Sequence, residues 1–231
     1  MIRLQHVTKI FPNGVKALDD VTLQIDEQEF VFVVGSSGAG KSTLLKLLYR
    51  ADQATGGEVH IHRFNVGKLN SGQIPYLRRN IGIVFQDYKL LPRRTVYENI
   101  AFALRVVGSP RHFIRRRVTQ VLELVNLVSK AKHLPAELSG GEQQRICIAR
   151  AIVNNPPILL ADEPTGNLDP ETSWEIFQLL HKINQRRTTV IVATHHKEVV
   201  DEFRKRVVAL ESGKVVRDQQ LGACHYVQLP K

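Results

Sequence analysis

The stretch 35-GSSGAGKST-43 decides the fold of this chain of 231 residues. It follows the apolar run 30-FVFVV-34, typical of a buried strand, and it opens 41-KSTLLKLLYR-50, whose apolar spacing predicts a helix. A glycine-rich turn between a strand and a helix, with the pattern G-x-x-x-x-G-K-[ST], is a phosphate loop. We therefore expect an α/β fold that binds a nucleoside triphosphate.

The residue types of this loop suit separate tasks. Its glycines let the backbone curl so that successive N–H groups point at phosphate oxygens. Lys41 reaches the β- and γ-phosphates, and the Ser42 hydroxyl ligates Mg²⁺. A glycine-rich turn without a ligand is the alternative, and the strand-loop-helix setting argues against it. The expected ATP-binding residues of the loop are Gly35, Ser36, Ser37, Gly38, Ala39, Gly40, Lys41, Ser42 and Thr43.

Three other apolar runs also end in polar residues. Gln86 follows 81-IGIVF-85, Asp162 and Glu163 follow 157-PILLA-161, and His195 follows 188-TTVIVAT-194. Ligands of an open parallel sheet bind beyond the carboxyl ends of its strands. If these strands are parallel neighbours, their polar ends converge with Lys41 on one edge. Any one of these residues alone would be incidental, but together they favour a catalytic site.

Phosphoryl transfer to water needs charge neutralisation at the γ-phosphate and one positioned water. We expect Glu163 to act as general base, His195 to hydrogen-bond the γ-phosphate, and Gln86 to bond the metal or the water. The expected Mg²⁺ ligands are Ser42, Gln86 and Asp162. No group resembling a kinase acceptor site is evident, so the sequence favours hydrolysis.

A second anion-binding pattern lies in 138-LSGGEQQR-145. Ser139 and Glu142 form an S-x-x-E capping box, which would open a helix with the positive end of its dipole outward. Gly140 and Gly141 remove the side chains that would keep a phosphate away. Because no second lysine-bearing loop accompanies it, this stretch is half of a site.

Composition sets the broad class of the protein. Apolar residues make up 43% of the chain and charged residues 23%, as in an ordinary globular protein. The longest apolar runs are far shorter than the ~20 residues of a membrane-spanning helix, and the N-terminus has no apolar signal segment. Cys147 and Cys224 lack metal-ligand spacing, which favours reduced thiols in a cytosolic protein.

The net charge of +10 is concentrated in residues 89–133, which hold ten Lys and Arg against two Glu. A solvated helical surface explains this segment, and so does attraction to an anionic lipid surface. Nucleic acid is the third choice. Tyr97, Phe102 and Phe113 lie among aliphatic residues, so we expect core positions for them rather than base-stacking platforms.

No linker or internal repeat divides the chain. Residues 1–34 are predicted to form short strands with turns at 12–14 and 26–28. Residues 95–134 are predicted to be mostly helical, broken at 108-GSP-110. From 138 onward strands and helices alternate, which predicts a parallel α/β sheet, and 206–218 contains two strand-like runs.

The chain resembles the ATP-binding cassette (ABC) ATPases along essentially its whole length. The phosphate loop, Gln86, 138-LSGGEQ-143, 158-ILLADE-163, 166-GNLD-169 and His195 occur in that family's order and approximate spacing. The resemblance implies one P-loop cassette over 1–231, with an α/β core at 27–62 and from 145 onward and an antiparallel β subdomain. It also implies a helical signature subdomain at about 89–140 and a loose tail at about 222–231.

The resemblance also implies how ATP is held. Phe11, ahead of the phosphate loop, takes the place of the family's adenine platform. Two copies are expected to form a head-to-tail homodimer around two ATP, in which the signature of one copy covers the γ-phosphate held by Lys41 of the other. The residues acting in trans would be Ser139, Gly140, Gly141, Glu142 and Gln143, with Asn167 and Asp169 in a dimer loop.

Within this family, residues 76–104, 154–176 and 203–218 resemble the bacterial cell-division branch. That resemblance implies an integral membrane partner (FtsX-like), a position on the cytoplasmic face of the plasma membrane at the division site, and regulation of cell-wall hydrolysis. The expected docking segment is 87-DYKLLPRR-94 with Tyr88, Leu90 and Leu91, and the basic segment 89–133 would face anionic lipid.

Two alternatives remain open from the sequence. The chain resembles the lipoprotein-releasing and macrolide-exporting branches in 162-DEPTGNLD-169, so it could serve an exporter. It could also be an ATP-gated scaffold whose dimerisation recruits cytoskeletal division proteins. His196 stands where the family usually has an acidic residue, and Cys147 inside the signature helix is unusual.

Overall fold

The computed structural model describes residues 1–220, so the expected tail at 222–231 and Cys224 lie outside the described residues. The chain divides into two compact units. The first unit comprises Met1–Lys68 and the segment from Ile191 onward, and the second unit comprises Leu69–Val190. Each unit carries part of the predicted site.

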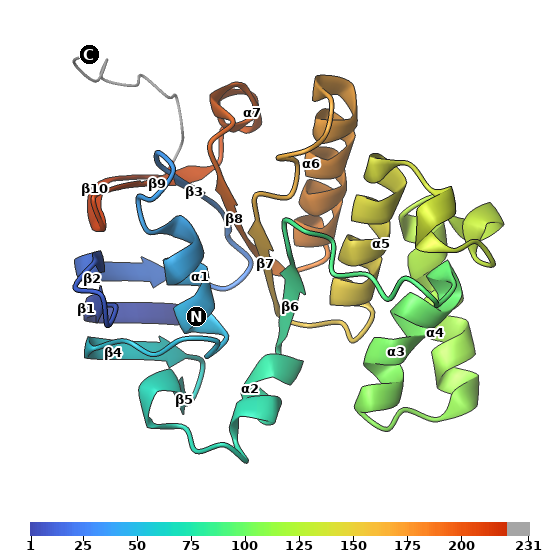
Figure 1. Cartoon of the computed structure of the whole chain (residues 1–231), viewed down its shortest axis with the longest axis horizontal. Coiled ribbons are helices and arrows are strands. Elements are labelled where there is room, and N and C mark those ends of the chain that lie inside the picture. The colour runs from blue at the N-terminus through green and yellow to red at the C-terminus, as the bar shows by residue number, and fades with distance from the viewer. Residues whose placement is uncertain (221–231) are drawn as a thin grey trace. The chain divides into compact units, whose positions relative to one another are not determined.

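The first unit contains an antiparallel sheet, coloured blue to cyan in Figure 1. Its strands are β1 (Ile2–Ile10), β2 (Lys16–Ile25), β4 (Gly56–Ile61) and β5 (Phe64–Asn65), in the order β2-β1-β4-β5. Alternating burial, as at Ile2 and Leu4, gives the sheet one apolar face. The antiparallel β subdomain is confirmed. The prediction that placed 56–61 in the α/β core is wrong, because β4 pairs with β1.

The α/β part of the first unit contains β3 (Phe30–Val34), α1 (Lys41–Leu48), α7 (Lys197–Phe203), β9 (Arg206–Glu211) and β10 (Lys214–Gln219). A short 3₁₀ turn, η1 (Val66–Lys68), closes the N-terminal segment. β3 is buried along its whole length and pairs in parallel with β9, while β9 and β10 form an antiparallel hairpin. The phosphate loop therefore leaves a fully buried strand.

The second unit contains two parallel strands and most of the helices. Its elements are α2 (Ile74–Arg79), β6 (Ile81–Val84), α3 (Val96–Val106), α4 (Arg111–Leu124), η2 (Val128–Lys130), η3 (Pro135–Glu137), α5 (Gly140–Ile152), β7 (Ile158–Asp162) and α6 (Pro170–Gln185). β6 pairs in parallel with β7, with Ile81 opposite Ile158. β8 (Thr189–Thr194) begins in this unit and ends in the first.

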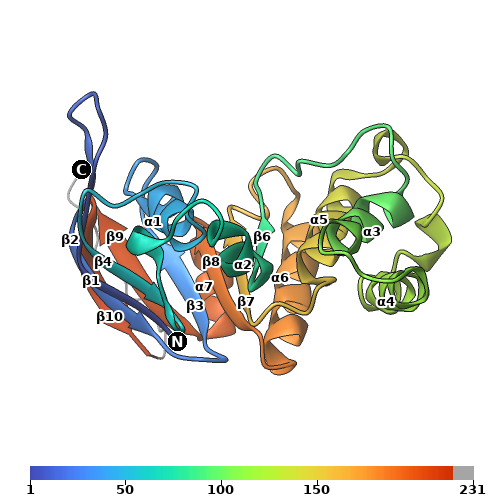
Figure 2. The ribbon, with the colours of Figure 1, turned by 90° about the horizontal axis from the view of Figure 1, so that it is seen from below.

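The prediction of a mostly helical stretch at 95–134 is confirmed for residues 96–124, and a short 3₁₀ turn, η2, follows. α3 and α4 are separated at 107–110, as expected from the Gly-Ser-Pro break, and Figure 2 shows both beside α5. Ile100 and Leu104 of α3 and Val118 of α4 are buried. The core position predicted for Phe102 is wrong: its side chain is 49% exposed, because it lies on the outward face of α3.

No helix within residues 1–220 has both the length and the apolar composition that crossing a bilayer requires.

Candidate functional site

The phosphate loop of the first unit has the geometry of an anion cradle. Gly40 caps α1 with φ 106°, and a Cβ there would stand 2.5 Å from the carbonyl oxygen of Ala17, so only glycine fits. The buried Lys41 ammonium donates to the carbonyl oxygens of Gly35 (2.9 Å) and Ser36 (3.1 Å). The loop thus holds a positive charge at the start of a helix, where phosphate binds best.

The rest of the loop has exposed residues and hydroxyl groups that suit a phosphate ligand. Ser36, Ser37 and Gly38 are exposed, and a Cβ at Gly38 would meet no heavy atom within 4 Å. Ser42 and Thr43 follow Lys41 in the first turn of α1 and are half-buried. A hydroxyl at this position is a hard oxygen donor of the kind that Mg²⁺ prefers.

His195 follows the end of β8, as predicted, and its side chain is exposed. Its ring stacks on that of His196, with centroids 4.6 Å apart and an interplanar angle of 27°. The backbone N–H of His196 donates to the Thr194 hydroxyl at 3.1 Å, which fixes the turn after the strand.

Phe11 lies in a tight turn, where its N–H donates to the carbonyl oxygen of Val15 at 2.9 Å. The Lys9 ammonium is 5.0 Å from the centroid of its ring. The ring is half-buried, and its use as an adenine platform stays a prediction.

Asp162 and Glu163 lie at the end of β7 in the second unit. Asp162 is the last residue of the strand, and Glu163 turns the chain with φ 46°, in the left-handed region. The Gly166 N–H donates to the Glu163 carbonyl oxygen at 3.2 Å, and the Gln86 amide nitrogen lies 3.5 Å from the Cβ position of Gly166. The end of β6 and the turn after β7 are therefore close together.

The signature segment begins α5 with the predicted capping box. Ser139 Oγ accepts from the Glu142 N–H at 3.2 Å, and the Ser139 N–H donates to the Glu142 carboxylate at 2.9 Å. That backbone N–H lowers the pKa of Glu142, and Lys130 at 3.6 Å adds to the effect. The Gln143 amide donates to the carbonyl oxygens of Pro135 and Leu138, both at 3.1 Å, and so holds the preceding turn.

The signature glycines lie in tight surroundings. A Cβ at Gly140 would stand 3.1 Å from Tyr88 Oη and 3.2 Å from Leu168 Cδ2. A Cβ at Gly141 would be 2.5 Å from Thr172 Cγ2. The predicted docking segment, through Tyr88, thus reaches the start of the signature helix.

Two side chains of α5 clamp the backbone of Tyr88, and no local sequence pattern indicates these contacts. The Tyr88 carbonyl oxygen accepts from the Arg150 guanidinium and from the Cys147 thiol, both at 2.9 Å, and Arg150 also donates to the Lys89 carbonyl at 2.5 Å. These bonds hold two consecutive left-handed residues, with φ 54° at Tyr88 and 51° at Lys89. Burial raises the pKa of Cys147 to about 12, so this thiol is structural.

The remaining predicted residues are also in the second unit. Asp169 caps α6 by accepting from the Thr172 N–H at 2.9 Å, and hydrogen bonds from Thr172 lower its pKa. Asn167 is exposed, and Leu90 and Leu91 are half-buried. Lys41, Ser42 and His195 belong to the first unit, whereas Gln86, Asp162 and Glu163 belong to the second, so the joint site stays a prediction.

Comparison with known proteins places this arrangement in a family. The profile of the ABC transporter family matches residues 18–166. The cell division ATP-binding protein FtsE of Bacillus subtilis is 54% identical over 222 residues, covering 96% of this chain and 97% of the relative. The protein of that name from Mycobacterium tuberculosis is 55% identical (96% and 97% covered), and the one from Escherichia coli K12 is 45% identical (92% and 96% covered).

Solved structures agree with this assignment. The ATP-binding cassette MJ0796, in a dimeric post-hydrolysis state bound to ADP and Pi, is 40% identical with a TM-score of 0.87, covering 96% of this chain and 99% of that one. CbiO1 of Clostridium perfringens, part of an ABC transporter complex, is 28% identical with a TM-score of 0.88, covering 95% and 88%. The fold, the phosphate loop and these relatives show that the chain belongs to the ABC transporter family and is an ATPase of the ABC type.

Proposed function

We propose that this ATPase acts in bacterial cell division as the ATP-driven subunit of an integral membrane complex. The observation that carries the proposal is the similarity to cell division ATP-binding proteins along more than nine-tenths of the chain, at 45–55% identity. The lack of a bilayer-spanning helix in residues 1–220 agrees with a subunit that reaches the membrane through a partner.

In the proposed reaction the loop 35–43 binds the phosphates of ATP, with the Lys41 ammonium against the β- and γ-phosphates. Glu163 accepts a proton from the attacking water, Gln86 orients that water, and His195 donates a hydrogen bond to the γ-phosphate. Hydroxyl, amide and carboxylate oxygens suit Mg²⁺, and Ser42, Gln86 and Asp162 would hold it. The metal would neutralise charge on the transferring phosphoryl group.

The proposed active form is a head-to-tail homodimer. Ser139 to Gln143 of one copy would cover the γ-phosphate bound by the other, with Asn167 and Asp169 at the same interface. Two features support this: no second lysine-bearing phosphate loop accompanies the helix start at Ser139, and the MJ0796 cassette is a dimer. Loss of the γ-phosphate would then weaken the dimer and reset the membrane partner.

The proposed partner is an FtsX-like integral membrane protein, docked on the segment 87–94 and coupled to cell-wall hydrolysis at the division site. Tyr88 supports this choice of docking segment because its hydroxyl oxygen lies 3.1 Å from the Cβ position of Gly140, so docking and ATP closure would share a side chain. The ATPase would then lie at the cytoplasmic face of the plasma membrane, where the basic segment meets anionic lipid.

The membrane protein recovered with this chain from detergent extract tests the proposal. We expect an FtsX-like protein, recovered less well with the Tyr88→Ala/Leu91→Ala variant. Equal recovery would rule out the docking segment. A lipoprotein-releasing or macrolide-exporting permease instead would overturn the division role.

A further inference from the structure

His196 is a residue at which this chain departs from the pattern of its family, which usually has an acidic residue at this position. It follows His195 directly, in the turn between β8 and α7. The His196 side chain is half-buried, and its Nε2 is buried without a hydrogen-bond partner among the residues that the structure describes. Packing, and not a hydrogen bond at Nε2, therefore holds this edge of the ring.

The backbone of His196 is tied to a buried strand. Thr194, the last residue of β8, is fully buried, and its hydroxyl accepts from the His196 N–H at 3.1 Å. A threonine hydroxyl that bonds to the backbone two residues further along the chain makes a compact turn. The main chain that carries the His196 ring is thus anchored to the core of the first unit.

His196 also occupies the capping position of α7. An acidic side chain at such a position can accept a backbone N–H of the first helical turn. The His196 side chain makes no capping bond within residues 1–220. The replacement of an acidic residue by histidine therefore gives up this capping chemistry, and what it supplies instead is an aromatic ring.

That ring lies against the ring of His195, with centroids 4.6 Å apart and an interplanar angle of 27°. The His195 side chain is exposed. Stacked aromatic rings attract each other, and an exposed side chain otherwise samples several rotamers. The half-buried ring of His196 therefore restricts the orientations that the exposed ring of His195 adopts.

We propose that His196 is a positioning residue for ATP hydrolysis, because its anchored ring orients the His195 ring by stacking. This role rests on the proposed function, in which His195 donates a hydrogen bond to the γ-phosphate, and it adds the residue that orients the donor. A donor that is already oriented when ATP binds loses less conformational freedom on forming that bond. His196 acts through the face of its ring, and its nitrogen atoms take no part.

Two substitutions at His196 separate the ring face from the nitrogen atoms. In the full-length protein with ATP and Mg²⁺, His196→Ala should lower kcat about tenfold, because a misoriented catalytic group loses much of its effect. KM for ATP should stay within about twofold of wild type, since the loop 35–43 holds the phosphates. His196→Phe keeps an aromatic face without nitrogen and should restore most of the lost kcat. His112→Ala, which removes an exposed histidine from α4, is the matched control and should change neither quantity.

Combination with a substitution of His195 shows whether the two residues act together. In a His195→Ala background, His196→Ala should lower kcat no further, because no ring is left to orient. The NMR signal of the His195 Cε1 proton, assigned by its loss in His195→Ala, gives a readout without turnover. The ring current of a stacked ring should place this signal upfield in wild type and in His196→Phe, and it should move downfield in His196→Ala.

Thermal unfolding of each variant checks that it folds, and His196→Gln, which also removes the ring, replaces His196→Ala if that variant does not fold. Wild-type kcat in the folded ring-less variant overturns the inference, as does an unchanged His195 signal. A His196→Phe protein as slow as His196→Ala, or an equal loss of kcat in the His195→Ala background, also overturns it. Normal hydrolysis by His195→Ala would refute the proposed role of His195 and the inference with it. A slow His195→Ala protein beside a fully active His196→Ala protein refutes the inference alone.

Discussion

Glu163 combines the residue type of a general base with an unfavourable backbone conformation. A non-glycine residue in the left-handed region costs on the order of 1–3 kcal/mol, and such residues cluster at functional sites. The turn at 163–168 stabilises it through the Gly166–Glu163 and Leu168–Thr165 hydrogen bonds. These bonds hold the Glu163 backbone in a defined conformation after β7.

The first prediction concerns this carboxylate. Glu163→Gln should lower the rate of ATP hydrolysis by at least about 100-fold, because general-base catalysis contributes about 10²–10⁴. Affinity for ATP should change little, since the phosphate loop is untouched. Phosphate release and fluorescent-nucleotide binding measure the two quantities. Glu171→Gln, an exposed glutamate on α6, is the matched control, and hydrolysis within a few-fold of wild type would refute the role.

The second prediction concerns the thiol that helps to clamp Tyr88. The pKa of Cys147 is about 12, above its ordinary value, so the reactive thiolate stays scarce until the solution is strongly alkaline. In a Cys224→Ser background, iodoacetamide should label the native protein far more slowly at pH 9 than the urea-unfolded chain. Equal rates at that pH would show that Cys147 is neither buried nor neutral.

At the scale of elements, two helices of the second unit begin with the same device. Thr95 and Glu98 cap α3 by the reciprocal bonds with which Ser139 and Glu142 cap α5. The first box begins α3 directly after the predicted docking segment 87–94, and the second begins the signature helix. One local structure thus serves two predicted surfaces.

Because the two capping boxes have the same structure, a variant of one is the control for the equivalent variant of the other. Thr95→Ala and Ser139→Ala should each cost about 1 kcal/mol in the free energy of unfolding, measured by urea denaturation. Only Ser139→Ala should impair ATP-dependent dimerisation, because only that hydroxyl is proposed to meet a phosphate. Equal impairment in both variants would reduce the Ser139 role to helix capping.

The fourth prediction is a pH dependence of the same elements. Backbone N–H groups of Thr95 and Ser139 lower the pKa of Glu98 and Glu142, so both carboxylates stabilise the fold above their ordinary pKa. This contribution is lost as pH falls through the lowered pKa values of the folded state. The Glu98→Gln/Glu142→Gln variant should therefore have a lower urea midpoint than wild type at pH 7. On acidification, the midpoint of the variant should fall by less than the midpoint of wild type. Parallel pH profiles would contradict this.

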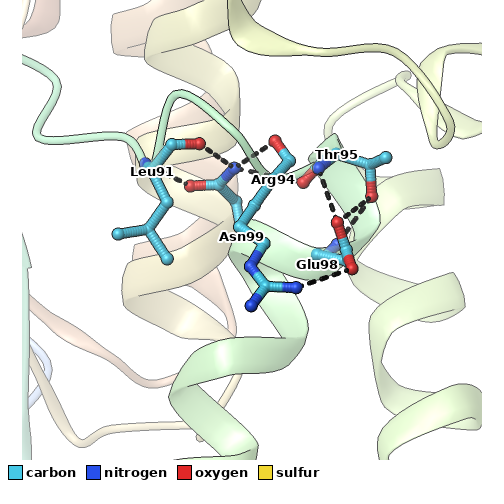
Figure 3. A network of polar contacts seen from close by, with 5 residues as sticks. All are labelled: Leu91, Arg94, Thr95, Glu98 and Asn99. Atoms are coloured by element: carbon cyan, nitrogen blue, oxygen red, sulfur yellow. Dashed lines mark hydrogen bonds and ion pairs between the residues drawn. The ribbon is translucent and has the colours of Figure 1, made fainter.

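Sequence patterns predicted the elements better than the contacts between them. The strand-loop-helix at 30–50 and the S-x-x-E box follow from local rules, which is why both are confirmed. The buried Asn99 side chain bonds to backbone groups four to eight positions earlier in the chain (Figure 3). The Arg150 side chain bonds to carbonyl oxygens 61 and 62 positions earlier. No local sequence pattern reveals either set of bonds. Phe102 was misplaced because an aromatic among aliphatics does not show which face of the helix is covered.

At the scale of the whole molecule, each unit carries an incomplete set of groups. The first holds the phosphate loop and His195, and the second holds Gln86, Asp162, Glu163 and the signature. No second lysine-bearing phosphate loop accompanies the signature, so the helix start at Ser139 suits an anion held elsewhere. We propose that this anion is the γ-phosphate bound by a second copy.

Light scattering on the Glu163→Gln variant tests this claim most directly. With ATP and Mg²⁺ its mass should double from the 26.1 kDa of one chain, and with ADP it should not. Adding Gly140→Trp should keep it monomeric, because Tyr88 and Leu168 leave no room for a large side chain near the proposed phosphate position. Thermal unfolding checks that this variant folds. A folded Gly140→Trp protein that still dimerises with ATP, or a Glu163→Gln protein that binds ATP as a monomer, would contradict the account.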